Sequence, residues 1–215
     1  MRIALVHAVT VAIAPVHDAF ARLWPEAECI DILDNSLSLD RERDGELTAA
    51  MTRRIGALAD YAASTGAAGI LFTCSAFGEA IEAAAAASRL AVLKPNEAMF
   101  EAALAAGNRI GMLATFGPSV GGMEDEFRAL AAARRSPATI ETVCVEPAMA
   151  ALKSGDGAGH DRLLAEAAPR LAHCDAVLLA HFSTSRGEKA VRTAIPRPVL
   201  TAPGAAVERL KALLA

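Results

Sequence analysis

The stretch Gly69-Ile70-Leu71-Phe72-Thr73-Cys74-Ser75 reads as a short buried strand that ends on polar and reactive side chains. A second stretch of the same character, Asp175-Ala176-Val177-Leu178-Leu179-Ala180-His181, places His181 107 residues after Cys74. A helical pattern follows each of them. Short apolar runs that alternate with helical patterns are typical of βα units in a parallel sheet. We therefore expect an α/β protein in which Cys74 and His181 hold equivalent positions.

Other parts of the chain repeat at the same offset. The matching pairs are Arg2-Ile3 with Arg109-Ile110, Asp18-Ala19-Phe20 with Asp125-Glu126-Phe127, Leu23 with Leu130, Val92-Leu93 with Val199-Leu200, and Glu101 with Glu208. One offset shared by separated segments indicates an internal duplication. The duplication predicts two α/β lobes related by a pseudo-twofold axis.

Each lobe is predicted to hold a mainly parallel four-stranded sheet. We expect strands at 3–6, around 30–33, 69–73, 91–93, 110–114, 140–145, 176–180 and 199–201. We expect helices at 15–23, 47–64, 78–87, 123–132, 160–173, 187–193 and 205–214, with further helices beginning after Pro95 and Pro203. Asp40–Glu46 is expected to be a solvated turn and Lys153–Gly159 a surface loop.

The domain boundaries follow from the duplication. Residues 1–95 with a C-terminal helix at 205–215 are expected to form the first lobe, and residues 96–204 the second. Ligands of open α/β sheets bind outside the carboxyl ends of the strands. We therefore expect the active site in a cleft between the lobes.

Composition excludes several classes of protein. The 215-residue chain is 53% hydrophobic and 4% aromatic and carries a net charge of −4, so it lacks the basic, aromatic-interleaved surface that favours nucleic acid. We expect no membrane partner, because the apolar run at the start is too short to span a bilayer and does not resemble a signal peptide. The four scattered cysteines form no CxxC pair, which favours reduced thiols in a cytoplasm. No cofactor or metal signature is visible, and we expect neither.

Cys74 is the strongest candidate for a catalytic residue. It stands between a predicted strand and a predicted helix, and a helix N-terminus lowers a thiol pKa. The alternative is a buried, inert cysteine, which is the interpretation we give to Cys29, Cys144 and Cys174.

His181 is the second catalytic candidate, because it repeats the place of Cys74 and histidine is the usual general acid–base near neutral pH. A capping or core role is the alternative. His7 ends the first predicted strand, where it would either bind substrate or cap a turn. Arg186 would either hold a carboxylate or lie on the surface. His160-Asp161 lacks a second pair of ligands at metal-binding spacing.

At these residues the chain resembles the aspartate/glutamate/hydantoin racemase superfamily, which includes glutamate racemase, maleate isomerase and arylmalonate decarboxylase. The resemblance rests on the two stretches quoted above and on Ile110-Gly111-Met112-Leu113-Ala114-Thr115. It implies two Rossmann-like lobes and two cysteines that flank the substrate α-carbon without a cofactor. Cys74 matches the first of these cysteines, whereas His181 stands where the second is expected.

The resemblance also implies a set of substrate-binding residues. Hydroxyl groups that hold the substrate carboxylate correspond to Ser75, Thr115 and Ser183, and less closely to Ser119. His7, Thr73, Phe116 and Asn35 complete the expected substrate-binding set, with selectivity set by loops 35–40 and 116–123. We also expect a homodimer, as for related proteins.

Three hypotheses for the function follow. The first is a cofactor-independent racemase or epimerase of a small carboxylate, with Cys74 and His181 as opposed acid–base groups. The second keeps the fold but uses Cys74 as a nucleophile, in a decarboxylase, a cis-trans isomerase or a hydrolase of a small dicarboxylate. The third is a small-molecule binding protein without catalysis.

Overall fold

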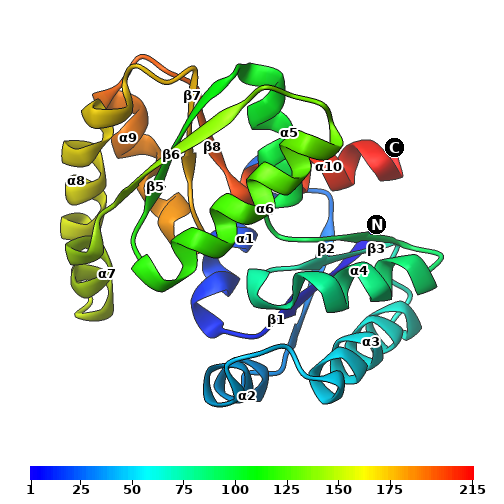
Figure 1. Ribbon diagram of the computed structural model, residues 1–215. Coiled ribbons are helices and arrows are strands. Elements are labelled where there is room, and N and C mark those ends of the chain that lie inside the picture. Colours follow the sequence, from blue (N-terminus) through cyan, green and yellow to red (C-terminus); the bar gives the residue numbers. More distant parts are fainter. The chain divides into compact units, whose positions relative to one another are not determined.

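The computed structural model describes residues 1–215 and contains two four-stranded sheets, shown in Figure 1. The first sheet has the order β2-β1-β3-β4 and the second the order β6-β5-β7-β8, and all neighbouring strands are parallel. The strands are β1 (Arg2–His7), β2 (Glu28–Leu33), β3 (Gly69–Phe72), β4 (Ala91–Leu93), β5 (Arg109–Ala114), β6 (Thr139–Cys144), β7 (Ala176–Leu179) and β8 (Val199–Thr201). The predicted fold class, α/β with two parallel four-stranded sheets, is confirmed.

Helices connect successive strands, as parallel pairing requires. They are α1 (Ile13–Leu23), α2 (Ser36–Asp44), α3 (Ala49–Ser64), α4 (Gly78–Ala87), α5 (Glu97–Ala106), α6 (Val120–Ala133), α7 (Glu146–Lys153), α8 (Gly157–Ala167), α9 (Glu188–Ala194) and α10 (Ala202–Leu214). Short 3₁₀ turns stand before several of them, including Ser75–Phe77 before α4 and Ser183–Gly187 before α9.

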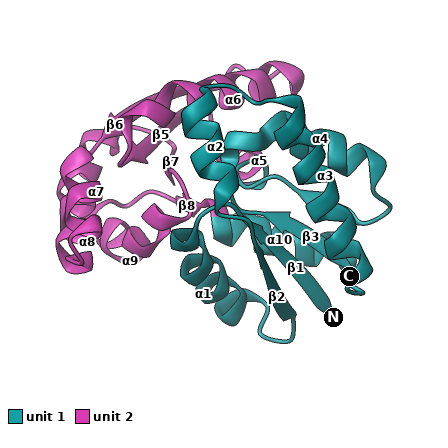
Figure 2. Cartoon of the chain, turned by 90° about the horizontal axis from the view of Figure 1, so that it is seen from below, with its two compact units in different colours: residues 1–98, 203–215 teal, residues 99–202 magenta.

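The chain divides into two compact units, coloured separately in Figure 2. The first comprises Met1–Ala98 and Pro203–Ala215, and the second comprises Met99–Ala202. The chain thus returns to the first unit for most of α10. A Cβ atom at Gly69 would lie 3.0 Å from the side chains of Leu210 and Leu214, so this glycine lets α10 pack closely on β3.

In the first unit, one sheet face packs against α2, α3 and α4. Alternate residues of β1 and β3, namely Ala4, Val6, Ile70 and Phe72, belong to this core cluster together with apolar residues of these helices. Because side chains alternate across a strand, the neighbouring residues Ile3, Leu5 and Leu71 face the other side of the sheet, where they are also buried. Both faces are covered, which explains why these strands are apolar throughout.

The second unit has the same two-sided construction. In Figure 1, α7, α8 and α9 lie on one side of the second sheet, and α5 and α6 lie on the other. Leu113, Val177 and Leu179 contribute to the core on the first side. On the second side Phe100 and Phe127 pack edge to face, with ring centroids 5.6 Å apart.

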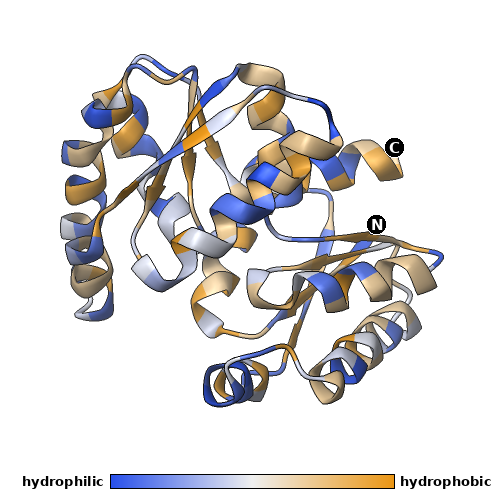
Figure 3. Cartoon of the chain, in the orientation of Figure 1, coloured by the Kyte–Doolittle hydropathy of each residue, from blue (hydrophilic) through white to orange (hydrophobic).

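Figure 3 shows apolar residues concentrated in the strands and polar residues distributed over the helices. None of the helices has both the length and the apolar character that a bilayer span requires.

Two helices were not predicted. Residues 36–44 form α2 rather than an irregular loop and a solvated turn, because Leu37 is buried in the core and Gly45, at φ 73°, ends the helix in the left-handed region. Residues 146–153 form α7, which begins with Pro147 at a position that tolerates proline. The predicted loop at 153–159 is shorter than expected, because Asp156 caps α8 by accepting from the N–H of Gly159 at 2.8 Å.

Candidate active site

The strand order fixes where each sheet can bind a ligand. In the first sheet, the connections from β1 and from β3 lead to opposite sides, so a ligand is expected to bind at the carboxyl ends of these two strands. In the second sheet the same place lies at the ends of β5 and β7. The residues that follow β3 and β7 are Thr73-Cys74 and Ala180-His181. Below, residues 73–77 are called the Cys74 turn and residues 180–187 the His181 turn.

Cys74 lies directly between β3 and a 3₁₀ turn. Its backbone is extended, at φ −120° and ψ 122°, and the residue is half-buried. The α4 helix begins only at Gly78, so the 3₁₀ turn separates Cys74 from the helix N-terminus.

The pKa of the Cys74 thiol is raised from its ordinary value of 9.0, which is opposite to the expected direction. Burial is the larger cause, since it penalises the thiolate, and a hydrogen bond from the backbone N–H of Ala76 offsets only part of it. The expected lowering of the thiol pKa was wrong, because it considered the helix N-terminus and left out the desolvation of the thiolate. At neutral pH Cys74 is therefore a protonated thiol.

A hydrogen-bond network that runs from a buried histidine to the surface lies beside the Cys74 turn. His7, at the end of β1, is 1% exposed. Its Nδ1 lies 2.8 Å from the Thr73 hydroxyl, and its Nε2 lies 3.0 Å from Asp31 Oδ1. His17 of α1 contacts the same carboxylate at 2.9 Å. Both ring nitrogens of His7 are thus engaged by protein groups, and the chain His17–Asp31–His7–Thr73 ends next to Cys74.

The charges in this network are set by burial and pairing. Burial is the main cause that lowers the pKa of His7 below 6.5, although Asp31 opposes it. Burial raises the pKa of Asp31, but the hydrogen bonds from His17 and His7 outweigh it and the net direction is down. The network therefore contains a carboxylate and a neutral His7 imidazole at neutral pH. Sequence reasoning missed Asp31, although it is an isolated acid in the apolar strand Cys29-Ile30-Asp31-Ile32-Leu33.

The His181 turn has a strained backbone. His181 adopts φ 69°, the left-handed region, which is uncommon for residues other than glycine. Such strain costs about 1–3 kcal/mol and is concentrated at functional sites.

The imidazole of His181 is only partly satisfied. Its Nδ1 is buried and has no hydrogen-bond partner. Burial lowers the pKa of His181 below 6.5, and a hydrogen bond with the backbone of Ala180 only partly offsets this. The imidazole is therefore a neutral base at neutral pH.

The predicted hydroxyl residues Thr115 and Ser119 of the second unit have different surroundings. Thr115, which follows β5, is buried, and its Oγ1 lies 3.4 Å from the hydroxyl of Thr184 in the His181 turn. This contact joins the ends of β5 and β7. Ser119 donates to the carbonyl of Phe116 at 2.8 Å, so its hydroxyl serves the local turn. Phe116 is 46% exposed, a large apolar side chain held at the surface.

The other predicted substrate-binding residues lie near the two turns. Ser75 and Ser183 are half-buried, and each is the first residue of a 3₁₀ turn after Cys74 or near His181. Asn35 is exposed and immediately precedes α2. Its neighbour Asp34 is fixed by Arg54 at 2.5 Å.

Arg186 does not present a free guanidinium group. Its Nε donates to Asp161 at 2.9 Å, and Asp161 Oδ1 also lies 2.8 Å from His160 Nδ1. Residues that could hold a metal gather elsewhere, where Glu141, His173 and Cys174 bring their donor atoms within 4.8 Å of one another.

Comparisons with known proteins bear on the family and the fold of the chain. A family model described as Asp/Glu/hydantoin racemase matches residues 10–208. No curated protein sequence matches significantly.

Solved structures share the fold at low sequence identity. Allantoin racemase from Pseudomonas fluorescens is 15% identical and superposes with a TM-score of 0.72, covering 100% of this chain and 91% of that chain. An aspartate racemase homologue from Pyrococcus horikoshii is 13% identical with a TM-score of 0.75, covering 99% and 98%. A glutamate racemase from Bacillus anthracis is 14% identical with a TM-score of 0.70, covering 99% and 80%. At these identities the superpositions establish the fold.

Proposed function

Because the chain belongs to the Asp/Glu/hydantoin racemase family, we propose that it is a cofactor-independent racemase or epimerase of a small carboxylate of the amino-acid or hydantoin type. In this proposal Cys74 and His181 transfer protons on opposite faces of the substrate. Membership makes the chain an enzyme of the isomerase class. The observation that carries the rest is that the two residues occupy the same place in two sheets of equivalent strand order, one residue beyond Thr73 after β3 and one beyond Ala180 after β7.

The protonation states of the two residues support this assignment. Racemisation by two groups needs one base that removes the α-proton and one acid that returns a proton to the other face. Burial lowers the pKa of His181 and raises the pKa of Cys74, so the resting enzyme offers a neutral imidazole and a protonated thiol. His181 therefore removes the proton in one direction while Cys74 delivers one.

The reverse reaction starts with the shared proton on His181 instead of on Cys74. After one turnover Cys74 is a thiolate and His181 an imidazolium, and this pair can act on the opposite enantiomer. Both forms bind the same number of protons, so they titrate together. Burial favours the neutral pair, and the strained backbone of His181 is consistent with a side chain held in place for this purpose.

A nucleophilic role for Cys74 is less well supported. A nucleophile needs a thiolate, and thiolates that act at neutral pH have a lowered pKa. The pKa of Cys74 is raised instead. The direction of this pKa shift therefore favours proton transfer over a covalent intermediate.

Hydroxyl and backbone N–H groups are proposed to hold the substrate. Ser75 and Ser183 begin the 3₁₀ turns, where backbone N–H groups lack partners within a helix and attract a carboxylate. Thr73 and Thr115 are proposed to support the substrate-binding turns through buried hydrogen bonds. Thr73 contacts His7, and Thr115 contacts Thr184. These residues would bind and orient the substrate, while N–H donors stabilise the enolate-like charge.

The experiment that tests the proposal follows the α-proton by NMR in D₂O. Purified enzyme is incubated with single enantiomers of acidic and neutral amino acids and of 5-substituted hydantoins, and inversion is followed in parallel by polarimetry. We expect at least one substrate that incorporates deuterium as it inverts. Turnover of a substrate without deuterium incorporation, or a covalent adduct at Cys74 in the mass spectrum during turnover, would contradict the proposal.

A further inference from the structure

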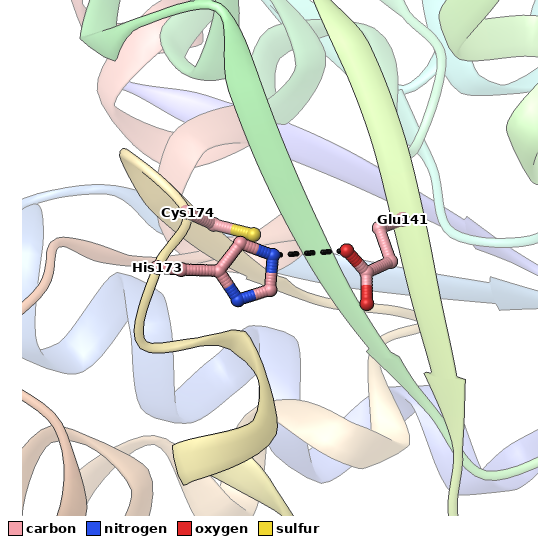
Figure 4. A group of neighbouring side chains, drawn as sticks. All are labelled: Glu141, His173 and Cys174. Atoms are coloured by element: carbon pink, nitrogen blue, oxygen red, sulfur yellow. Dashed lines mark hydrogen bonds and ion pairs between the residues drawn. The ribbon is translucent and has the colours of Figure 1, made fainter.

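Three potential metal ligands lie close together near the amino-terminal ends of the strands in the second sheet. The His181 turn lies at the opposite, carboxyl ends of these strands. Glu141 lies in β6, and His173 and Cys174 lie in the segment that leads into β7. His173 Nε2 lies 3.0 Å from Glu141 Oε2, and the three donor atoms lie within 4.8 Å of one another. Figure 4 shows the Cys174 thiol beside the imidazole ring of His173, with the Glu141 carboxylate facing them from the neighbouring strand.

The central strand leaves room for this arrangement. Gly111 of β5 pairs in register with Glu141, and paired residues direct their side chains to the same face. A Cβ atom at Gly111 would lie 3.2 Å from Cys174 Sγ and 3.0 Å from Leu171 Cβ. The sulfur therefore lies almost directly over the glycine backbone, on the face that Glu141 also reaches.

The first unit provides an internal comparison. The sheet register and the 107-residue offset place Ile30, Gly66 and Ala67 at the positions of Glu141, His173 and Cys174. None of these three has a side chain that can bind a metal. The shared fold alone therefore does not require the cluster.

The types of donor limit the kind of ion. Thiolate, imidazole and carboxylate together suit borderline metals such as Zn²⁺ and Co²⁺, whereas Mg²⁺ and Ca²⁺ take oxygen ligands. A Cys174 thiolate beside the Glu141 carboxylate carries two negative charges, which one divalent ion neutralises. Cys174 is 1% exposed, whereas the side chains of His173 and Glu141 are 53% and 58% exposed. A bound ion would thus be coordinated by a buried sulfur on one side and remain accessible to solvent on the other.

We propose that Glu141, His173 and Cys174 form a solvent-open, three-ligand site for a divalent ion of the zinc type, separate from the proposed catalytic residues. The ion would link β6 to the segment that enters β7. Because binding occurs only in the folded chain, it would stabilise the protein in proportion to the free ion concentration.

The test uses Co²⁺ as a spectroscopic probe. The full chain, without an affinity tag and first freed of metal with a chelator, is titrated with Co²⁺. We expect saturation at one ion per chain, with a thiolate-to-cobalt charge-transfer band in the near ultraviolet and visible bands of a low-coordinate ion. No charge-transfer band in the wild-type protein would overturn the proposal whatever the variants do.

Variants then assign the ligands. Cys174→Ser should abolish the band, and His173→Ala and Glu141→Gln should weaken binding by at least the roughly 10–100-fold that loss of an outer-shell partner costs. The latter two residues lie at the surface, so their substitution does not endanger folding. Cys144→Ser, which removes an exposed thiol of the same strand, is the matched control and should leave the titration unchanged.

Thermal unfolding gives a second readout. Zn²⁺ should raise the melting temperature of the wild-type chain and of Cys144→Ser, and not of His173→Ala. A Co²⁺ affinity or a thermal shift in His173→Ala equal to that of the wild-type chain, or a band or a shift that disappears in Cys144→Ser, would also overturn the assignment. These measurements need no substrate, so their result is independent of the proposed racemase activity.

Discussion

The Cys74 turn and the His181 turn follow equivalent strands, yet they are built from different chemistry. Beneath the Cys74 turn, His7 and Thr73 form a buried hydrogen bond of 2.8 Å at the ends of β1 and β3. The positions 107 residues later are Ala114 and Ala180, both fully buried and apolar.

The helix–strand contact beside each turn differs in the same way. In the first unit His17 contacts Asp31, which pairs in register with Leu5. In the second unit, at the equivalent places, Thr142 donates to Glu124 at 2.6 Å, and Thr142 pairs in register with Met112.

The comparison indicates that the sheet fixes where a reactive residue stands, and that local packing decides its chemistry. Cys74 has an unstrained backbone beside a polar network, whereas His181 has a strained backbone and a buried Nδ1 without a partner. In the proposed function, these two equivalent positions serve as a thiol acid and an imidazole base.

The largest expected effect comes from removing either reactive group. Cys74→Ala and His181→Ala should each reduce the racemisation rate by about 10²–10⁴-fold, the usual contribution of a positioned acid or base. The double variant should lose little more than either single variant, because the two groups act as a unit. Cys29→Ser is the control for loss of a thiol. Steady-state polarimetry gives the rates, and a Cys74→Ala enzyme that retains most of its activity would remove the thiol from the mechanism.

The pH profile should reflect both turns. In the proposed mechanism, the direction in which His181 is the base needs neutral His181 and protonated Cys74, whose ordinary pKa values of 6.5 and 9.0 are lowered and raised respectively. For a substrate that does not itself titrate in this range, kcat/KM should be flat from about pH 6.5 to 9.0. Below the pKa of His181 and above the pKa of Cys74, kcat/KM should fall tenfold per pH unit. A midpoint inside that interval would show that the two groups are not buried as described.

Removing a hydrogen bond from the His7 network should lower the stability of the protein more than removing the Thr142–Glu124 hydrogen bond of the second unit. Thr73→Val removes the partner of His7 Nδ1 and leaves a buried polar nitrogen unsatisfied, at a cost of about 1–3 kcal/mol. Thr142→Val removes a partly exposed hydroxyl in the second unit and should cost less, about 0.5–1.5 kcal/mol. Urea unfolding measures both, and equal losses would show that the His7 network has no special structural role.

The smallest effect concerns the backbone of His181. At φ 69° a glycine is unstrained, whereas alanine carries a penalty of about 1–2 kcal/mol. His181→Gly should therefore be more stable than His181→Ala by about 1 kcal/mol, although both should be inactive. The same pair of substitutions at Cys74, where φ is −120°, should reverse the order. Denaturant unfolding of the four variants distinguishes the two turns.

Sequence patterns were sufficient for the sheets and for the places of Cys74 and His181. Buried parallel strands are continuous apolar runs, and the 107-residue offset aligned them without any structural information. Helix α2 was not predicted, since its sequence Ser36-Leu37-Ser38-Leu39-Asp40-Arg41 is mostly polar and only Leu37 reaches the core.

The chemistry of the site was harder to predict, because it depends on packing. The direction of the Cys74 pKa follows from burial, which a sequence does not display. The contact between His7 and Thr73 joins residues 66 positions apart, and that among Glu141, His173 and Cys174 joins two strands across a third. Such contacts need the register of the sheet.

The central claim is that Cys74 and His181 serve opposite faces of one substrate, and proton wash-out from single enantiomers tests it most directly. In D₂O, Cys74→Ala should exchange the α-proton of one enantiomer without inverting it, because His181 remains as the base on that face. His181→Ala should exchange only the other enantiomer, and only at a pH high enough to ionise the Cys74 thiol, whose pKa is raised. If both variants exchange the same enantiomer, or if either still inverts its substrate at the wild-type rate, the two residues do not form an opposed acid–base pair.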